Sequence, residues 1–256
     1  MGLLSIFKPQ QILPAIDFSQ LAVDMHSHLI PGIDDGAKNM DETIAMLAKF
    51  EALGYKKVIT TPHVYSDCYR NTPETILGGL KNVQQTAKDL GLTIEIEAAA
   101  EYYCDEYFLD LIEKKELLSI DNKYVLMEFS FHAEMDNWRE FVFGVRAAGY
   151  TPIIAHFERY MYWIGSTKVA QEMVELGAKL QLNYNSLAGH YGPSIKKQAE
   201  LLISNNLISF LATDCHRIQH LRIMEDNANN AFVHKLLNSG LLLNNQLMKQ
   251  EQALAH

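Results

Sequence analysis

Residues 21–63 read LAVDMHSHLIPGIDDGAKNMDETIAMLAKFEALGYKKVITTPH. The apolar run at 21–28 predicts a strand that ends in two histidines, and apolar side chains at helical spacing follow it. Asn39 stands three residues before Glu42, a pairing typical of a helix N-terminus. Gly54 allows the left-handed conformation that ends a helix, and a second apolar run begins soon after it. Strand, helix, glycine and strand in this order predict parallel α/β architecture.

The same order recurs along the chain. Seven strand-like runs are predicted, at residues 21–28, 57–63, 93–101, 123–130, 151–156, 178–185 and 207–214. Six of the seven runs carry an ionisable residue at their C-terminal end. An open doubly wound sheet gathers its functional residues at one crevice, whereas a barrel brings every strand end to one rim. The even distribution therefore favours a seven-stranded (β/α) barrel of the TIM type.

Length and composition are those of a globular protein. The chain has 256 residues, 48% of them hydrophobic and 21% charged, and an α/β barrel of about this length forms one domain. Residues 1–20 hold a single lysine, which follows their first apolar stretch instead of preceding it. We therefore interpret residues 1–20 as an N-terminal extension and not as a signal peptide, and expect residues 21–256 to form a single domain.

Charge and cysteine content exclude several classes of function. The net charge is −9 and the basic residues form no stripe, which argues against binding to nucleic acid or to an anionic membrane surface. No apolar run reaches the roughly 18 residues of a membrane span, so no membrane insertion is expected. The three cysteines are odd in number and widely spaced, which fits a reducing cytoplasm better than a disulfide framework.

Histidines and carboxylates stand at or just after the predicted strand ends. They are His26, His28, Asp35, His63, Glu101, Glu128, His156, Asp214 and His216. Strand residues two apart point the same way, so His26 and His28 can reach one ion. Taken singly, each histidine can also be a surface residue, and Glu101 or Glu128 a partner in a buried salt bridge. The whole set exceeds what one tetrahedral zinc needs, and nitrogen and oxygen ligands without thiolates suit two or three Zn²⁺, Mn²⁺ or Fe²⁺ ions.

Phosphate is the substrate group that these residues indicate. Arg159 follows His156 closely, and a guanidinium beside metal ligands suits bidentate binding of phosphate. Three divalent ions would outweigh the four carboxylates of the set and make the pocket positive in an acidic chain. Phosphatase chemistry at a cysteine needs an arginine six positions after the thiolate, and none of the three cysteines has one.

Taken together, these motifs resemble those of the bacterial capsule and exopolysaccharide tyrosine-protein phosphatases, which belong to the polymerase-and-histidinol-phosphatase (PHP) superfamily. The resemblance rests on six elements in order between about residues 21 and 220: DMHSH at 24–28, PGIDDGAK at 31–38, TPH at 61–63, EYY at 101–103, HFER at 156–159 and TDCH at 213–216. Two departures stand out. Phe157 replaces the proline usual in the fifth element, and Arg217 and Arg222 both compete for the place of a second phosphate-binding arginine.

The resemblance implies a distorted seven-stranded barrel with three divalent metal ions, most often Mn²⁺, with Fe²⁺ or Zn²⁺ as alternatives. The three groups of ligands that it implies are His26, His28, Glu101 and Asp214; Glu101, Glu128 and His156; and Asp35, His63 and His216. Arg159 would bind phosphate, and His63 or His216 would assist through metal-bound water.

The activity that the resemblance implies is that of a metal-dependent protein-tyrosine phosphatase. A metal-bridging hydroxide would attack phosphorus, and the substrate would be a phosphotyrosine-containing protein, namely a bacterial tyrosine kinase of polysaccharide export. Two alternatives remain open. One is a small-molecule phosphatase of the same superfamily, such as histidinol-phosphate phosphatase. The other is a regulatory module that binds phosphotyrosine with little turnover.

Two further features have no assigned role in this scheme. Aromatic residues after the strand ends are either packed in loops or form a wall for an aryl group: Tyr65, Tyr69, Tyr102, Tyr103, Tyr107, Tyr160, Tyr162 and Trp163. Five other histidines, His132, His190, His220, His234 and His256, are left out of the site, His190 being the best of them. Helical segments expected at 225–240 and 244–254 would pack on the barrel exterior or between the subunits of a homo-oligomer.

Overall fold

The computed structural model describes residues 13–248, and in this part of the chain the strands form two parallel sheets. The smaller sheet has the order β1-β2-β4, with β1 at Val23–Asp24, β2 at Lys57–Thr60 and β4 at Glu95–Ala98. The larger sheet has the order β3-β5-β6-β7-β8-β9, with β3 at His63–Val64, β5 at Glu101–Tyr103, β6 at Tyr124–Glu128, β7 at Thr151–Ile154, β8 at Lys179–Asn183 and β9 at Phe210–Ala212. The strands therefore lie side by side in chain order.

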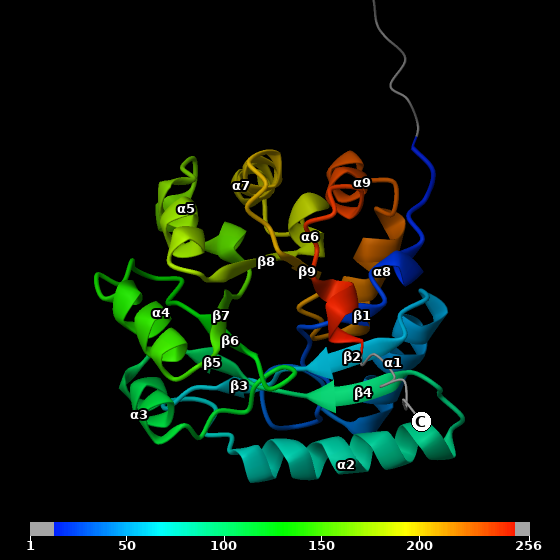
Figure 1. The fold of residues 1–256 in the computed structure, drawn as a ribbon. Coiled ribbons are helices and arrows are strands. Elements are labelled where there is room, and N and C mark those ends of the chain that lie inside the picture. Colours follow the sequence, from blue (N-terminus) through cyan, green and yellow to red (C-terminus); the bar gives the residue numbers. More distant parts are fainter. Residues whose placement is uncertain (1–12, 249–256) are drawn as a thin grey trace, which may run out of the picture.

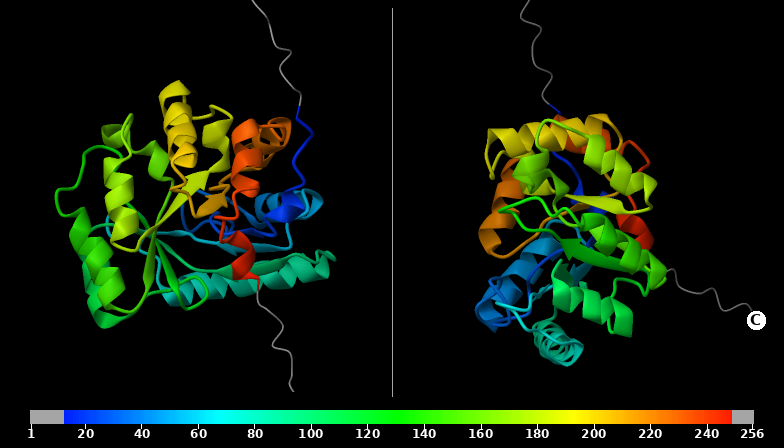
Figure 2. Two further views of the ribbon diagram at one scale, coloured as in Figure 1. Left: turned by 45° about the horizontal axis from the view of Figure 1, so that its top comes forward. Right: turned by 90° about the vertical axis from the view of Figure 1, so that its left-hand side faces the viewer.

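Helices lie on the outside of the strands, as Figures 1 and 2 show. The α-helices are α1 (Met40–Ala52), α2 (Pro73–Asp89), α3 (Glu106–Lys114), α4 (Trp138–Ala147), α5 (Lys168–Glu175), α6 (Tyr184–Leu187), α7 (Pro193–Ser204), α8 (Ile218–Asp226) and α9 (Ala231–Leu237). Short 3₁₀ turns are η1 (Phe18–Gln20), η2 (Phe157–Arg159), η3 (Met161–Trp163) and η4 (Asn244–Leu247). No helix among the described residues is long and apolar enough to cross a membrane.

The first helix begins where the sequence predicted. The Asn39 side chain accepts a hydrogen bond from the Glu42 N–H at 3.0 Å, and such a cap contributes about 1 kcal/mol. Met46, Leu47 and Phe50 are buried on the inner face of α1. Gly54, just beyond the helix, has φ +99°, a conformation that glycine adopts without strain.

Two of the seven predicted strands are each divided between the sheets. The run at 57–63 forms β2 and β3, because Pro62 lacks the N–H that would continue the ladder. The run at 93–101 forms β4 and β5. Backbone hydrogen bonds still cross the division, since the Ala99 N–H donates to the Thr60 carbonyl at 2.9 Å and the Glu101 N–H to the Pro62 carbonyl at 3.1 Å.

Between β1 and β9, side chains replace most of the backbone pairing. Asn244 donates to the carbonyls of Val23 and Leu211 at 3.0 and 2.8 Å. The Asp24 carboxylate accepts from the N–H of Thr213 at 2.8 Å, and beyond it a single parallel bridge joins Ser27 to Cys215. Within residues 13–248 neither sheet closes on itself, so the structure confirms parallel α/β architecture and leaves the seven-stranded barrel as a proposal.

Two apolar clusters stabilise this arrangement. The larger cluster lies between strands and helices, and it includes Phe18, whose ring stacks on Tyr55 with centroids 6.4 Å apart. Residues near the end of the predicted N-terminal extension therefore pack in the same core as the rest of the chain. The smaller cluster takes its members mainly from the strands themselves: Val23, Met25, Ile59, Ala99, Ile120, Tyr124, Leu126, Ile153, Ala155, Phe210, Ala212 and Leu247.

The C-terminal segments differ from the prediction. The single helical segment expected at 225–240 is wrong, because α8 ends at Asp226 and α9 begins only at Ala231. Asn230 starts the second helix by accepting hydrogen bonds from the N–H groups of Phe232 and Val233, which favours a new helix over a continuous one. Of the segment expected at 244–254, the first turn is the 3₁₀ helix η4, and residues 249–254 lie outside the described part.

Candidate metal centre

The nine predicted ligands meet at one place, although two of them do not stand at the end of a strand: His63 begins β3 and Glu101 begins β5. Their nitrogen and oxygen atoms form four overlapping groups, within each of which the atoms lie no more than 4.8 Å apart. The groups are His28, Asp35, His63 and His216; His26, His28 and Asp214; His26, Glu101 and His156; and His63, Glu101 and Glu128. The structure thus brings together side chains that are far apart in the sequence.

Glu101, at the start of β5, lies at the centre of the cluster. Its Oε2 is 3.1 Å from His26 Nε2, 3.4 Å from His28 Nε2 and 3.2 Å from His63 Nδ1. Its Oε1 is 3.1 Å from His156 Nε2. Burial alone would raise its pKa, but the His26 and His63 imidazoles hold the pKa of Glu101 well below its usual range. A buried carboxylate is therefore ionised among four imidazoles.

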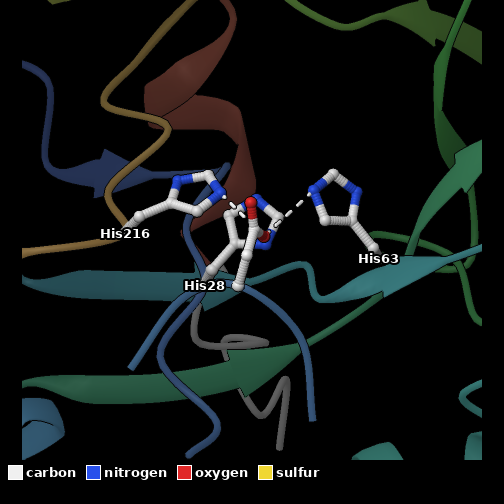
Figure 3. A group of neighbouring side chains, drawn as sticks. His28, His63 and His216 are labelled. Atoms are coloured by element: carbon white, nitrogen blue, oxygen red, sulfur yellow. Dashed lines mark ion pairs between the residues drawn. The ribbon is translucent and has the colours of Figure 1, made fainter. Parts of the chain in front are cut away.

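Asp35 closes the cluster on the exposed side. Its Oδ1 lies 3.3 Å from His216 Nε2 and 3.5 Å from His63 Nε2, so the turn after the first strand does bring a carboxylate over the strand ends. Figure 3 shows the rings of His216 and His63 on either side of His28. The rings of His28 and His216 are stacked, with their centroids 3.9 Å apart.

Asp34 determines which nitrogen of His28 faces the cluster. Its Oδ2 is 2.8 Å from His28 Nδ1, and a carboxylate only accepts hydrogen bonds, so Nδ1 carries the proton. The same oxygen accepts from the backbone N–H of His63 at 3.2 Å. His28 therefore presents Nε2 to the other ligands, as a metal-binding histidine with a carboxylate behind it does.

A pair of amide side chains on β8 does the same for His26. The Asp214 carboxylate accepts from Asn183 Nδ2 at 2.8 Å, and Asn183 Oδ1 in turn accepts from Gln181 Nε2 at 2.8 Å. Gln181 Oε1 is then left to face His26 Nδ1 at 3.0 Å and to accept from the His156 backbone N–H at 2.8 Å. An amide oxygen only accepts, so His26 Nδ1 is the donor and its Nε2 faces the cluster.

This donor arrangement fits divalent cations. His26 Nε2 and His28 Nε2 are 3.3 Å apart, and both lie within 3.5 Å of carboxylate oxygens of Glu101 and Asp214. Carboxylates that face one buried point require positive charge there, which protons on the ring nitrogens or metal ions can supply. Burial lowers the pKa of His156 to about 4, which keeps that imidazole in the neutral form that binds metal. Nitrogen and oxygen ligands without sulfur suit Mn²⁺, Fe²⁺ or Zn²⁺.

Arg159 lies against the cluster at the end of η2. Its Nη1 donates to Asp214 Oδ2 at 3.0 Å, and its side chain keeps 24% of its surface exposed. The guanidinium lies 4.7 Å from the ring centroid of Phe131 and 4.4 Å from that of Tyr191. A cation close to two aromatic rings, next to the predicted ligands and open to solvent, can bind an anionic group.

Comparison with known proteins identifies the family. A family model described as "Capsular polysaccharide synthesis, CpsB/CapC" matches residues 22–241. The chain belongs to the CpsB/CapC family. The resemblance inferred from the motifs is therefore confirmed.

Curated relatives of the chain are named tyrosine-protein phosphatases. Tyrosine-protein phosphatase CpsB from Streptococcus pneumoniae is 29% identical over 202 residues, which cover 77% of this chain and 83% of that protein. Tyrosine-protein phosphatase YwqE from Bacillus subtilis is 30% identical over 240 residues, covering 88% of this chain and 92% of that protein.

Solved structures agree with this assignment. One of them comes from a crystallographic study of YwqE from Bacillus subtilis and CpsB from Streptococcus pneumoniae, described as unique metal-dependent tyrosine phosphatases. The match has a TM-score of 0.74 and 27% identity, and it covers 87% of this chain and 94% of that one. The lactonase Lmo2620 from Listeria monocytogenes, at 12% identity and a TM-score of 0.52 over 92% of this chain and 94% of that one, shares the fold alone.

In this CpsB/CapC member, the two competing arginines occupy different places. Arg217 lines a pocket together with Asp35, so it adjoins one of the predicted ligands. Arg222, on α8, lines a neighbouring pocket with Lys49 of α1 and with Glu225. Both arginines are exposed.

Four residues that hold the ligands were missed by the sequence analysis. They are Asp34, Gln181, Asn183 and His220. Gln181 and Asn183 alternate with Leu180 and Leu182 in β8, and this spacing is the signal that places both amides on the same side. His220, which was left out of the site, accepts from the His216 backbone N–H at 3.3 Å through Nδ1. Asp34 lies in the PGIDDGAK element at 31–38 but was given no role there, and no comparable pattern in the sequence indicated His220.

Proposed function

We propose that this protein is a metal-dependent protein-tyrosine phosphatase whose substrate is a phosphotyrosine-containing tyrosine kinase of capsule or exopolysaccharide synthesis. The observation that carries the proposal is the convergence of nine histidines and carboxylates beside Arg159. The names of CpsB and YwqE support the choice of phosphotyrosine.

Three divalent ions, most readily Mn²⁺, would occupy the cluster, with Fe²⁺ or Zn²⁺ as alternatives. The three groups of residues that would hold them are His26, His28, Glu101 and Asp214; Glu101, Glu128 and His156; and Asp35, His63 and His216. Such ions lower the pKa of water to about 7 and neutralise charge on phosphate oxygens.

The chain's own residues would orient the substrate. Arg159 would bind two nonbridging phosphate oxygens through its planar fork, and Arg217 is better placed than Arg222 to add a second contact because it adjoins Asp35. The phenol of the tyrosine leaving group has a pKa near 10. It therefore needs less protonation by His63 or His216 than an alkyl alcohol leaving group would need.

The remaining parts of the proposal concern the whole chain. The bridges that Asn244, Asp24 and Ser27 make between β1 and β9 support a distorted seven-stranded barrel. We propose a single domain over residues 21–256, with Ile16 and Phe18 of the preceding segment packed in its core, that acts in the cytoplasm. Whether it acts as a monomer or a homo-oligomer is decided by measuring its mass in solution.

The decisive experiment compares substrates. With Mn²⁺ added, kcat/KM is measured for a phosphotyrosyl peptide and for histidinol phosphate. We expect the peptide to be preferred; a preference of tenfold or more for histidinol phosphate would replace the proposal with a small-molecule phosphatase. Negligible hydrolysis of both compounds by fully metal-loaded protein would instead indicate a phosphotyrosine-binding module. Elemental analysis of protein purified without chelator identifies the metal.

A further inference from the structure

A pocket of about 210 Å³ opens directly beside the metal cluster, and its walls are mostly aromatic. Two proposed ligands, His63 and Glu128, form the side that faces the cluster. The other lining residues are Tyr65, Tyr69, Tyr103, Phe131 and His132. The pocket is thus continuous with the place where phosphate would bind.

The tyrosine walls are held in place by the backbone and by stacking. Tyr65 and Tyr69 exchange two backbone hydrogen bonds of 2.9 Å, which fix the turn between them. The rings of Tyr65 and Tyr103 stack with centroids 4.1 Å apart. The Tyr69 ring lies nearly parallel to the His63 ring at 5.6 Å, so the aromatic surface begins at a proposed ligand.

The opposite wall leads to the proposed phosphate-binding residue. Phe131 lies 5.2 Å from the His156 ring and carries the Arg159 guanidinium 4.7 Å above its own ring. A phosphate near Arg159 and the cluster would therefore lie next to the aromatic pocket. Aromatic side chains bind another ring by offset or edge-to-face packing and exclude water around it.

We propose that this pocket binds the aromatic ring of the phosphotyrosine side chain and so selects aryl over alkyl phosphates. The inference rests on the proposed function. It also reduces to three the eight aromatic residues that the sequence offered as a wall for an aryl group. Tyr102 and Tyr160 are buried in the core, where their hydroxyls accept from the N–H groups of Leu118 and Phe129. Only Tyr65, Tyr69 and Tyr103 of the eight line the pocket.

Phosphonate inhibitors test the pocket without the effect of leaving-group reactivity. The inhibition constant Ki is measured for benzylphosphonate and for methylphosphonate with metal-loaded wild type, Tyr103→Ala and Tyr69→Ala. Tyr103→Ala is the main variant because the Tyr103 ring stacks on Tyr65, whereas the Tyr69 ring stacks on the proposed ligand His63. Phe143→Ala is the matched control, since Phe143 is 74% exposed on α4 and lies outside this pocket.

We expect wild type and Phe143→Ala to bind benzylphosphonate about tenfold more tightly than methylphosphonate. In Tyr103→Ala and Tyr69→Ala the two Ki values should differ by no more than about twofold, while metal content and circular dichroism match wild type. If the Ki values still differ tenfold in both variants and phosphotyrosine is still hydrolysed, the proposed role of the pocket is wrong and the proposed function stands. Failure of wild type to hydrolyse any phosphomonoester and to bind either phosphonate would overturn the proposed function and the pocket together.

Discussion

Arg159 and Asp214 form an ion pair across the edge of the cluster, with Arg159 Nη1 3.0 Å from Asp214 Oδ2. They are 55 positions apart in the sequence, and the same Asp214 oxygen also accepts from Asn183. The guanidinium is therefore held beside the metal ligands before any substrate arrives. Such preorganisation is what a phosphate-binding arginine needs, because it lowers the cost of ordering the side chain on binding.

Arg159→Ala should leave the metal content unchanged and reduce kcat/KM for a phosphotyrosyl peptide by about 10²–10³-fold, mainly through a higher KM. Arg159→Lys should recover only part of the loss, because an ammonium keeps the charge and lacks the planar fork. Steady-state kinetics with metal analysis of each variant tests this. Unaltered kinetics in Arg159→Ala would exclude the phosphate-binding role.

Glu101→Gln should remove the ionised carboxylate that three imidazoles share through Oε2. We expect bound metal to fall and activity to drop below about one per cent, a larger effect than the 10–100-fold typical of residues behind the ligands. Metal is measured by elemental analysis and the fold by circular dichroism. Glu97→Gln on β4, whose carboxylate pairs with Lys57 at 2.9 Å and lies outside the four ligand groups, is the matched control and should keep its metal. Full metal content in Glu101→Gln would contradict the assignment of the centre.

Gln181→Leu should weaken metal binding about 10–100-fold, because His26 loses the acceptor that keeps its proton on Nδ1. Gln181→Glu keeps that acceptor and should lose less affinity. The measurement is titration of metal-free protein with Mn²⁺, together with nitrogen NMR of the His26 tautomer. Gln198→Leu is the matched control, since Gln198 is equally buried and bonds to Gly165 and Ser166 instead of to the cluster. Equal metal affinities for Gln181→Leu and wild type would show that the amide pair has no part in positioning ligands.

Asn244→Ala should destabilise the protein by about 3 kcal/mol, since buried backbone groups of Val23 and Leu211 lose their partners. The adjacent Asn245 is exposed and makes one hydrogen bond to the Gln20 carbonyl, so Asn245→Ala should cost less than about 1 kcal/mol. Denaturant unfolding measures both changes. Similar values for the two variants would mean that the β1–β9 junction does not depend on the Asn244 side chain.

Much of the local structure could be predicted because it depends on neighbours in the sequence. The cap at Asn39, the glycine at 54 and the alternation of strand and helix follow from backbone preferences and side-chain periodicity. The single helical segment expected at 225–240 failed because a cap at Asn230 competes with continuation of the helix, and apolar spacing alone does not distinguish the two.

By itself, the sequence determined the parallel strand order and the chemistry of the ligands, since residue type and position at a strand end are local properties. Only the tertiary structure decided which atoms meet. His26 and Glu101 are 75 positions apart and come within 3.1 Å because the segment that follows β1 meets the start of β5. Gln181 determines that the proton of His26 is on Nδ1. Pairing with neighbouring strands determines that two of the predicted strands are divided between the sheets. These features depend on hydrogen bonds between distant segments, whose partners are defined only when the chain has folded.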